Sequence, residues 1–328
     1  MNSGDTPGSC CAPAREPSKA THAGAALAAP RDVAPDSQRA VVSLPAGTFL
    51  MGTNYERGFP ADGEGPVRPV SLSAFDIETY PVTNADFSAF VAATKFRTEA
   101  EVFGWSFVFW SHIPPERFEE LVEDTAAPTP WWCKVPGATW AKPLGPGSDV
   151  EATLHHPVVH VSWNDAAAYA AWASKALPTE AQWEYAARGG LAQKLYPWGD
   201  ELTPGGKHLC NIWQGQFPRH DTGEDGYRGS CPVDSFPPNG YGLYSVTGNV
   251  WEWCADWFHT AFSAKSALHD PAGPLTGEAR VMKGGSFLCH ASYCNRYRVA
   301  ARTCNTPDSS ASNIGFRCVR NSARSDTI

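Results

Sequence analysis

The run of sequence after Gly190 most constrains how this chain can fold, because no helical repeat of apolar residues continues there and Gly, Pro, Asn and Trp become dense. The whole chain has 29 Gly and 28 Pro in 328 residues, above the average share but below that of a disordered chain. It also has 13 Trp, whose large rings can build a core where regular elements are few. We therefore predict a folded, loop-rich protein whose functional region consists of loops and short strands.

Regular elements are predicted mainly before Gly190. Period-two patterns indicate strands, and spacings of three and four after capping residues indicate helices. The predicted strands are Val41–Pro45, Gly47–Gly52 and Val70–Phe75. The three predicted helices begin near Thr83 or Asn84, at Ser162 and at Thr179, and the last two end near Ala176 and Arg188. Because there is no internal repeat and no composition break after residue 40, we predict a single α+β domain over residues 40–322.

The two ends of the chain are predicted to lie outside this domain. Residues 1–39 have only Met1, Leu27 and Val33 as large apolar side chains, too few to offset the entropy lost on ordering. We predict a disordered tail there and a short C-terminal tail at residues 323–328.

Charge and hydropathy exclude several classes of protein. A formal net charge of -8 provides no basic field for nucleic acid. No continuous apolar stretch matches a secretory signal or a membrane span. Ten cysteines in so long a chain are then best read as reduced thiols, most of them packing residues. These features predict a soluble, cytoplasmic protein that binds neither nucleic acid nor membrane.

The densest motif is Gly284–Arg298, which contains Cys289 and Cys294. Two thiols this close can serve as metal ligands, a disulfide or a nucleophile pair. Their separation places them apart on a helix and on opposite faces of a strand, so they converge only if the backbone bends. The spacing matches neither a thioredoxin-like redox pair nor a four-ligand zinc site, and two thiolates alone suit Cu(I). A structural disulfide or two buried thiols remain open.

Two further segments offer clustered oxygen atoms. Asp221–Tyr227 resembles a calcium loop, but Pro232 stands where an EF-hand needs a glutamate. A noncontiguous Ca²⁺ site from Asn211, Asp225 and backbone carbonyls is one interpretation, and a solvated acidic turn is the other. Glu252 lies between two tryptophans, so a cation or an arginine should neutralise it unless it is exposed.

The chain from about Val41 to Val319 resembles the formylglycine-generating enzyme family, copper-dependent oxidases that activate sulfatases. The Cys289 and Cys294 pair singles out this branch among relatives with other chemistry. The other supporting motifs are His156–Trp163, Leu177–Glu180, Asn211–Gly215, Gly248–Trp253 and Asn305–Ser310.

The resemblance implies a single irregular domain of the C-type-lectin-like fold, with low regular structure and two bound Ca²⁺ ions. It implies that Cys289 and Cys294 hold Cu(I), which the cysteine of a Cys-x-Pro-x-Arg segment joins as a third thiolate. O₂ as co-substrate then oxidises that cysteine through a thioaldehyde to formylglycine, with release of sulfide. The implied partner is an unfolded or nascent sulfatase polypeptide, and we expect the enzyme to be a monomer.

The resemblance also implies roles for further residues, each assigned from the matching position in the family's motifs. Ser286 would lie beside the metal, and Trp251 would wall the pocket. The expected substrate contacts are Arg302, Asn305, Asn313, His290 and Tyr293. His290 and Tyr293 could instead be packing residues, and Arg302 could form a structural ion pair.

The same resemblance implies two sets of calcium ligands. The first consists of Asn211, the carbonyl of Ile212, Asp225 and the carbonyl of Tyr227. The second consists of Ser245, Gly248, Val250 and Glu252. In the second set Ser245 stands where relatives commonly have Asn, so a water or a shorter ligand must serve there.

Two other functions compete with the oxidase. A sister-family non-haem iron sulfoxide synthase acting on a small thiol would need a His-rich metal set, and His155, His156 and His160 do not form its usual pattern. A non-enzymatic, Ca²⁺-binding lectin-like module would instead join the two cysteines in a disulfide.

Overall fold

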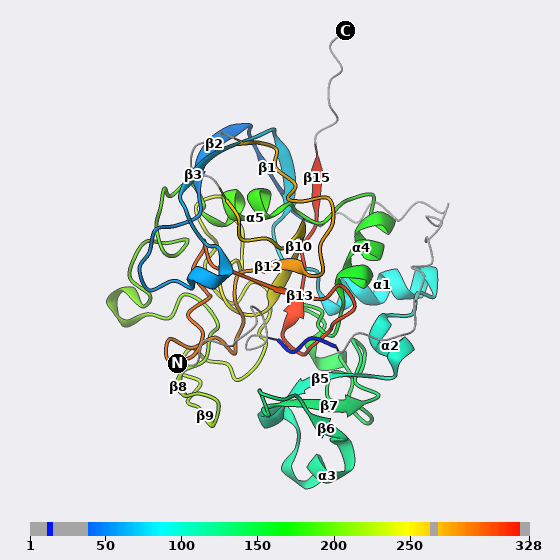
Figure 1. The fold of residues 1–328 in the computed structure, drawn as a ribbon. Helices are drawn as coiled ribbons and strands as arrows, with labels where there is room; N and C mark the ends of the chain where they lie inside the picture. Colours follow the sequence, from blue (N-terminus) through cyan, green and yellow to red (C-terminus); the bar gives the residue numbers. More distant parts are fainter. Residues whose placement is uncertain (1–11, 16–38, 263–267, 322–328) are drawn as a thin grey trace.

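The computed structural model describes residues 12–15, 39–262 and 268–321 (Figure 1). In these residues the α-helices are short and all precede Gly190. They are α1 (Asn84–Thr94), α2 (Glu99–Phe103), α3 (Phe118–Leu121), α4 (Trp163–Trp172) and α5 (Glu180–Ala187). None of the helices in the described ranges is both long and apolar enough to cross a membrane.

The described strands form five small sheets. The central sheet has the order β13 (Arg302–Asn305), β12 (Arg280–Lys283), β10 (Trp251–Trp257) and β14 (Ile314–Gly315). Two outer sheets are β1 (Val41–Leu44), β4 (Phe75–Glu78), β15 (Val319–Asn321), and β11 (Leu268–His269), β3 (Arg68–Leu72), β2 (Gly47–Met51). The remaining two are β5 (Trp105–Phe109), β7 (Trp132–Pro136), β6 (Asp124–Thr125), and the pair β8 (Gly215–Gln216), β9 (His220–Asp221).

The predicted helix starts are confirmed, because each is fixed by a local capping box. Thr83, Ser162 and Thr179 accept hydrogen bonds from the backbone amides three residues on, whose side chains accept in return. The second helix ends at Trp172, earlier than predicted, since Ser174 adopts a left-handed backbone with φ of 54°. The sequence prediction missed α2, although Thr98 caps it by the same device.

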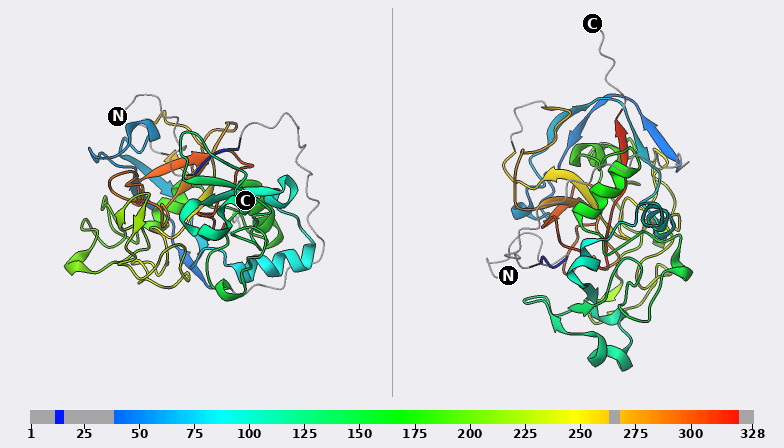
Figure 2. Two further views of the ribbon diagram at one scale, coloured as in Figure 1. Left: turned by 90° about the horizontal axis from the view of Figure 1, so that it is seen from below. Right: turned by 90° about the vertical axis from the view of Figure 1, so that its right-hand side faces the viewer.

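The sheets occupy different levels of the molecule. β1 to β4 and β15 lie at one end and the β5, β7, β6 sheet with α3 at the other, with the central sheet between them (Figures 1 and 2). The largest core cluster is aromatic and includes both Cys289 and Cys294, so the loops that follow the central sheet are fixed by ring packing. This agrees with the predicted loop-rich interior.

Residues 12–15 depart from the predicted disordered tail. Ala12 and Arg15 are 1% and 5% exposed, and this dark-blue segment lies beside β13 in Figure 1. The Asn305 side-chain amide donates to the carbonyls of Ala12 and Pro13, at 3.4 and 3.2 Å. The prediction is therefore wrong for these four residues, because polar contacts, which a count of apolar side chains ignores, hold them in place.

Candidate active site

A tight turn brings the two thiols of the densest motif together. The amide of Cys289 donates to the carbonyl of Ser286 at 2.9 Å, and the amide of Cys294 donates to the carbonyl of His290 at 2.7 Å. These bonds supply the bend that the five-residue separation requires. The two sulfur atoms lie 3.5 Å apart and both side chains are 2% exposed.

The separation of the sulfurs shows that Cys289 and Cys294 are not joined to each other by a disulfide. A disulfide would place them about 2.05 Å apart. Metal–thiolate bonds of roughly 2.3 Å would place them about 3.8 Å apart in a tetrahedral site and about 4.6 Å in a linear one. The pair therefore fits a shared soft metal after an opening of about an ångström. Burial, together with the neighbouring Cys294, raises the pKa of Cys289 well above its ordinary value.

The thiols open onto a pocket of only about 10 Å³, room for roughly one water molecule. Its lining combines the sulfurs with aromatic rings and one hydroxyl, from Trp131, Trp132, Phe217, Ser286, Leu288, Cys289, Tyr293 and Cys294. The ring of Tyr293 stacks on Phe217 with centroids 4.6 Å apart and meets Trp131 edge-on at 5.3 Å. A pocket this small and apolar admits a diatomic or water-sized molecule beside sulfur.

Ser286 supplies the hydroxyl of the pocket lining, and Asn313 contacts that hydroxyl from outside the lining. The Asn313 amide donates to the Ser286 hydroxyl at 3.1 Å, and the backbone amide of Ser286 donates to the Cys289 sulfur at 3.4 Å. Both residues are 0% exposed. The structure thus places Ser286 beside the thiols, as predicted from the resemblance, and holds its hydroxyl through Asn313.

One neighbour of the thiols was missed by the sequence prediction. The Arg296 guanidinium lies 3.8 Å from the Cys294 sulfur and is itself paired with Asp62 at 2.5 Å. A nearby positive charge favours a thiolate over a thiol. The sequence did contain a signal for this contact, because Arg296 follows Cys294 by only two residues.

Several other predicted site residues lie elsewhere. The pocket wall assigned to Trp251 is formed by Trp131 and Trp132, because Trp251 faces the core from β10. His290 is partly exposed and bonds to the Ser292 hydroxyl at 2.8 Å, outside the lining, whereas Tyr293 lines the pocket.

Arg302 forms a buried ion pair and does not face a surface where a substrate could bind. Its guanidinium contacts Glu180 at 2.7 Å and donates to the carbonyls of Asp62 and His259. Lys283 lies 3.7 Å from the same glutamate. The geometry therefore matches the alternative of a structural ion pair and corrects the predicted role, since sequence could not show which acid faces this arginine.

Two of the four groups in the first calcium set, the Ile212 carbonyl and the Asp225 carboxylate, come together. The side-chain nitrogen of Gln214 contacts both the Ile212 carbonyl and the Asp225 carboxylate, so these two oxygens converge on one point. The Tyr227 and Ile212 amides each donate to Asp225 at 3.0 Å. Convergent carboxylate and carbonyl oxygens are the donors that Ca²⁺ prefers.

In the second calcium set, the only carboxylate, that of Glu252, is paired with an arginine. Glu252 is 0% exposed and makes a two-pronged ion pair with Arg317, each N···O distance being 2.7 Å. The Trp183 indole donates to the same carboxylate at 2.7 Å. Of the two ways to neutralise Glu252 expected from sequence, the structure has the arginine, and the geometry adds nothing in favour of a cation there.

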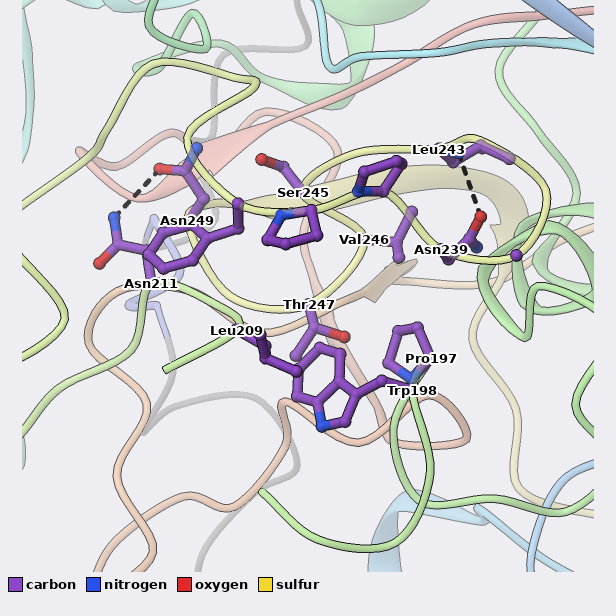
Figure 3. A pocket seen from close by; sticks show the side chains of 14 residues that line it. Pro197, Trp198, Leu209, Asn211, Asn239, Leu243, Ser245, Val246, Thr247 and Asn249 are labelled. Carbon is purple, nitrogen blue, oxygen red and sulfur yellow. Dashed lines mark hydrogen bonds between the residues drawn. The ribbon is translucent and has the colours of Figure 1, made fainter. Parts of the chain in front are cut away.

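A larger cavity, of about 230 Å³, shares no lining residue with the thiol pocket (Figure 3). Asn211 and Asn249, joined by a side-chain hydrogen bond of 3.4 Å, stand at one side, and Pro197 and Trp198 stand opposite. Its lining has no cysteine, histidine or charged residue. Among the described residues there is also no group of three or more His, Cys, Asp or Glu side chains placed to hold a metal. The thiol pocket is thus the better candidate for redox chemistry.

Comparisons with known proteins show which family this chain is similar to. A family model described as the sulfatase-modifying factor enzyme 1-like domain matches residues 26–322. The formylglycine-generating enzyme of Thermomonospora curvata is 61% identical over 293 residues, 88% of this chain and 96% of that protein. The inactive C-alpha-formylglycine-generating enzyme 2 of Mus musculus is 48% identical over 288 residues, 87% of each chain. The solved structure of PvdO from Pseudomonas aeruginosa superposes with a TM-score of 0.61 at 26% identity, over 88% of this chain and 98% of that one.

Fold and site together define a single-domain, loop-rich protein with a buried pair of thiols at a small aromatic pocket. The chain belongs to the sulfatase-modifying factor enzyme 1-like family. The predicted fold class, a single irregular α+β domain of this family, is confirmed. Because active and inactive relatives are both similar, membership alone does not decide the activity, and the thiol pair must carry that inference.

Proposed function

We propose that this protein converts the cysteine of a Cys-x-Pro-x-Arg motif in sulfatase polypeptides to formylglycine, using O₂ and Cu(I) held by Cys289 and Cys294. The observation that carries the proposal is the buried pair of thiols, 3.5 Å apart and not joined to each other, at the wall of a water-sized pocket. Similarity to the formylglycine-generating enzymes of Thermomonospora curvata and, at 54% identity over 284 residues, of Bos taurus supports the same reaction.

The bound copper would supply the activation of O₂, and the protein residues would hold the metal, position the small molecule and exclude water. Cys289 and Cys294 must lose their protons to bind the metal, and Arg296 favours that loss at Cys294. Ser286 offers its hydroxyl, held by Asn313, to a water or oxygen molecule in the pocket. The rings of the pocket wall exclude bulk water, which protects a reactive sulfur intermediate until it is hydrolysed.

The overall change oxidises the substrate carbon and reduces O₂. A β-carbon hydrogen and the thiol proton leave the substrate cysteine, and hydrolysis of the resulting thioaldehyde gives the aldehyde and sulfide. O₂ ends as water, with the further electrons supplied by an external thiol reductant. The eight described cysteines are buried and form no disulfide with one another, which supports our proposal that the protein works in a reducing, cytoplasmic compartment.

Aerobic incubation with a Cys-x-Pro-x-Arg peptide tests the reaction. The copper-loaded protein with added thiol reductant is expected to convert the peptide cysteine to an aldehyde. Mass spectrometry detects the mass loss, and hydrazine trapping identifies the carbonyl. A matched peptide with serine in place of cysteine should remain unchanged. No aldehyde at full copper loading would overturn the proposal.

Calcium at the Asn211, Ile212, Asp225 and Tyr227 set is proposed as a structural cofactor. Asp225→Asn keeps a hydrogen-bond acceptor but removes the charge, so the variant should lose most of the rise in melting temperature that Ca²⁺ gives the wild type. A ligand present at 100 times its Kd stabilises a fold by about 2.7 kcal/mol. Thermal unfolding in EDTA and in excess Ca²⁺ measures the difference. Asp221→Asn, in the same loop but outside the set, is the matched control, and an equal Ca²⁺ effect in both variants would contradict the assignment.

A further inference from the structure

Four residues near the start of the chain, Ala12–Arg15, are bound to the segment Asn305–Ser310. The carbonyls of Ala12 and Pro13 accept hydrogen bonds from the Asn305 amide, and the amide of Arg15 donates to the Ser309 hydroxyl at 2.8 Å. Backbone contacts of this kind hold an extended peptide in a groove. Asn305 is also one of the residues expected to contact the substrate.

The side chain of Arg15 occupies a site suited to a guanidinium. It lies 3.9 Å from the ring centroid of Trp105 and 4.4 Å from that of Phe103. It donates to the carbonyl of Trp105 at 2.7 Å and to the carbonyl of Asp308 at 3.1 Å. It also donates to the Ser310 hydroxyl at 3.2 Å. Stacking combined with several fixed acceptors selects arginine over lysine.

This peptide-binding surface continues into the candidate active site. Ser310, which contacts Arg15, lies three residues before Asn313. Asn313 donates to Ser286, and the Ser286 amide donates to the sulfur of Cys289. One loop, Asn305–Asn313, therefore joins the Arg15 site to the thiol pocket.

The sequence of the bound segment explains why it lies there. Cys11-Ala12-Pro13-Ala14-Arg15 has cysteine, proline and arginine at the spacing of Cys-x-Pro-x-Arg, and none of the other nine cysteines begins this motif. The proline and arginine of the motif are both within the described segment. The chain thus presents the residues that the substrate is proposed to present.

We propose that the chain contains an internal copy of its substrate motif, and that Ala12–Arg15 occupies the substrate-binding groove as a tethered competitor. The identity of the groove rests on the proposed function. A tethered ligand acts at an effective concentration of the order of mM, so it lowers the apparent affinity for any polypeptide that uses the same groove. A substrate must displace this segment before it reaches the thiols.

A binding measurement tests the competition without any redox chemistry. The probe is a fluorescent peptide that copies residues 8–19 with both cysteines replaced by serine. Its Kd, from fluorescence anisotropy, is expected to be about tenfold or more lower for full-length Arg15→Ala than for the wild type, because the internal competitor is weakened. Arg31→Ala, an arginine of the same N-terminal sequence outside the motif, is the matched control and should bind like the wild type. A probe with its own arginine replaced by alanine should bind much more weakly.

A second measurement uses the unaltered protein. The Arg15 amide is hydrogen-bonded to Ser309, so its hydrogen exchange should be slow and should accelerate when excess probe is added. Equal probe affinity for the wild type and Arg15→Ala, no binding to Arg15→Ala, or exchange at Arg15 that excess probe leaves unchanged would each overturn the proposal. Failure of the aldehyde assay alone would leave these binding results intact and would instead count against the proposed reaction.

Discussion

Cys294→Ser is expected to reduce aldehyde formation to the level of copper-free protein and to abolish tight Cu(I) binding. A hydroxyl is a hard, weakly acidic donor, so it cannot replace the thiolate that selects Cu(I). Cys289→Ser should behave alike, because both sulfurs lie at the same buried site. The fold should survive, since each change swaps one small side chain for another and costs about 1–3 kcal/mol if the hydroxyl finds no partner.

Copper stoichiometry on freshly reduced protein and peptide turnover are the two measurements. Cys133→Ser is the control, because Cys133 is equally buried but belongs to a separate core cluster around β5 and β7. It should keep both copper and activity. Normal turnover by Cys294→Ser would mean that the two-thiolate site is wrong.

The parts of the site that sequence predicted are those fixed by local geometry. Cys289, Cys294 and Ser286 lie within nine residues of one another, and the turn between them depends on neighbouring backbone bonds. The helix starts are local in the same sense, because each capping box spans four residues. Capping residues located the helix starts, and the resemblance to a family assigned roles to the three site residues, since a continuous motif has its own local geometry.

The parts that sequence missed depend on pairing across long distances in the chain. Arg302 pairs with Glu180, which lies 122 positions earlier in the chain, and no local sequence pattern around either residue indicates the other as its partner. The Arg15 contacts were missed for a different reason. A low content of apolar residues argues correctly against a core, but it ignores a short polar peptide bound by another part of the chain. The signal was present, since Cys11–Arg15 matches the substrate motif letter by letter.

Arg317→Met is expected to cause the largest loss of stability among single charge changes, about 3–5 kcal/mol, because it leaves the Glu252 carboxylate buried without its cation. Arg317 is 0% exposed and also donates to the carbonyl of Tyr244 at 2.8 Å, so that acceptor is left unpaired as well. A typical domain is stable by only about 5–15 kcal/mol, so this loss is severe. Urea unfolding in EDTA, where no added cation can substitute, measures it.

The control is Arg320→Met, which removes an arginine from an ion pair with Asp76 where its side chain is 60% exposed. Exposed pairs contribute about 0–1 kcal/mol, so this change should be nearly neutral. Combining Arg317→Met with Glu252→Gln removes the stranded charge and should recover part of the lost free energy of unfolding. If Arg317→Met were as mild as Arg320→Met, then Arg317 would not be the group that neutralises Glu252, and the second calcium set would regain the carboxylate that the arginine now holds.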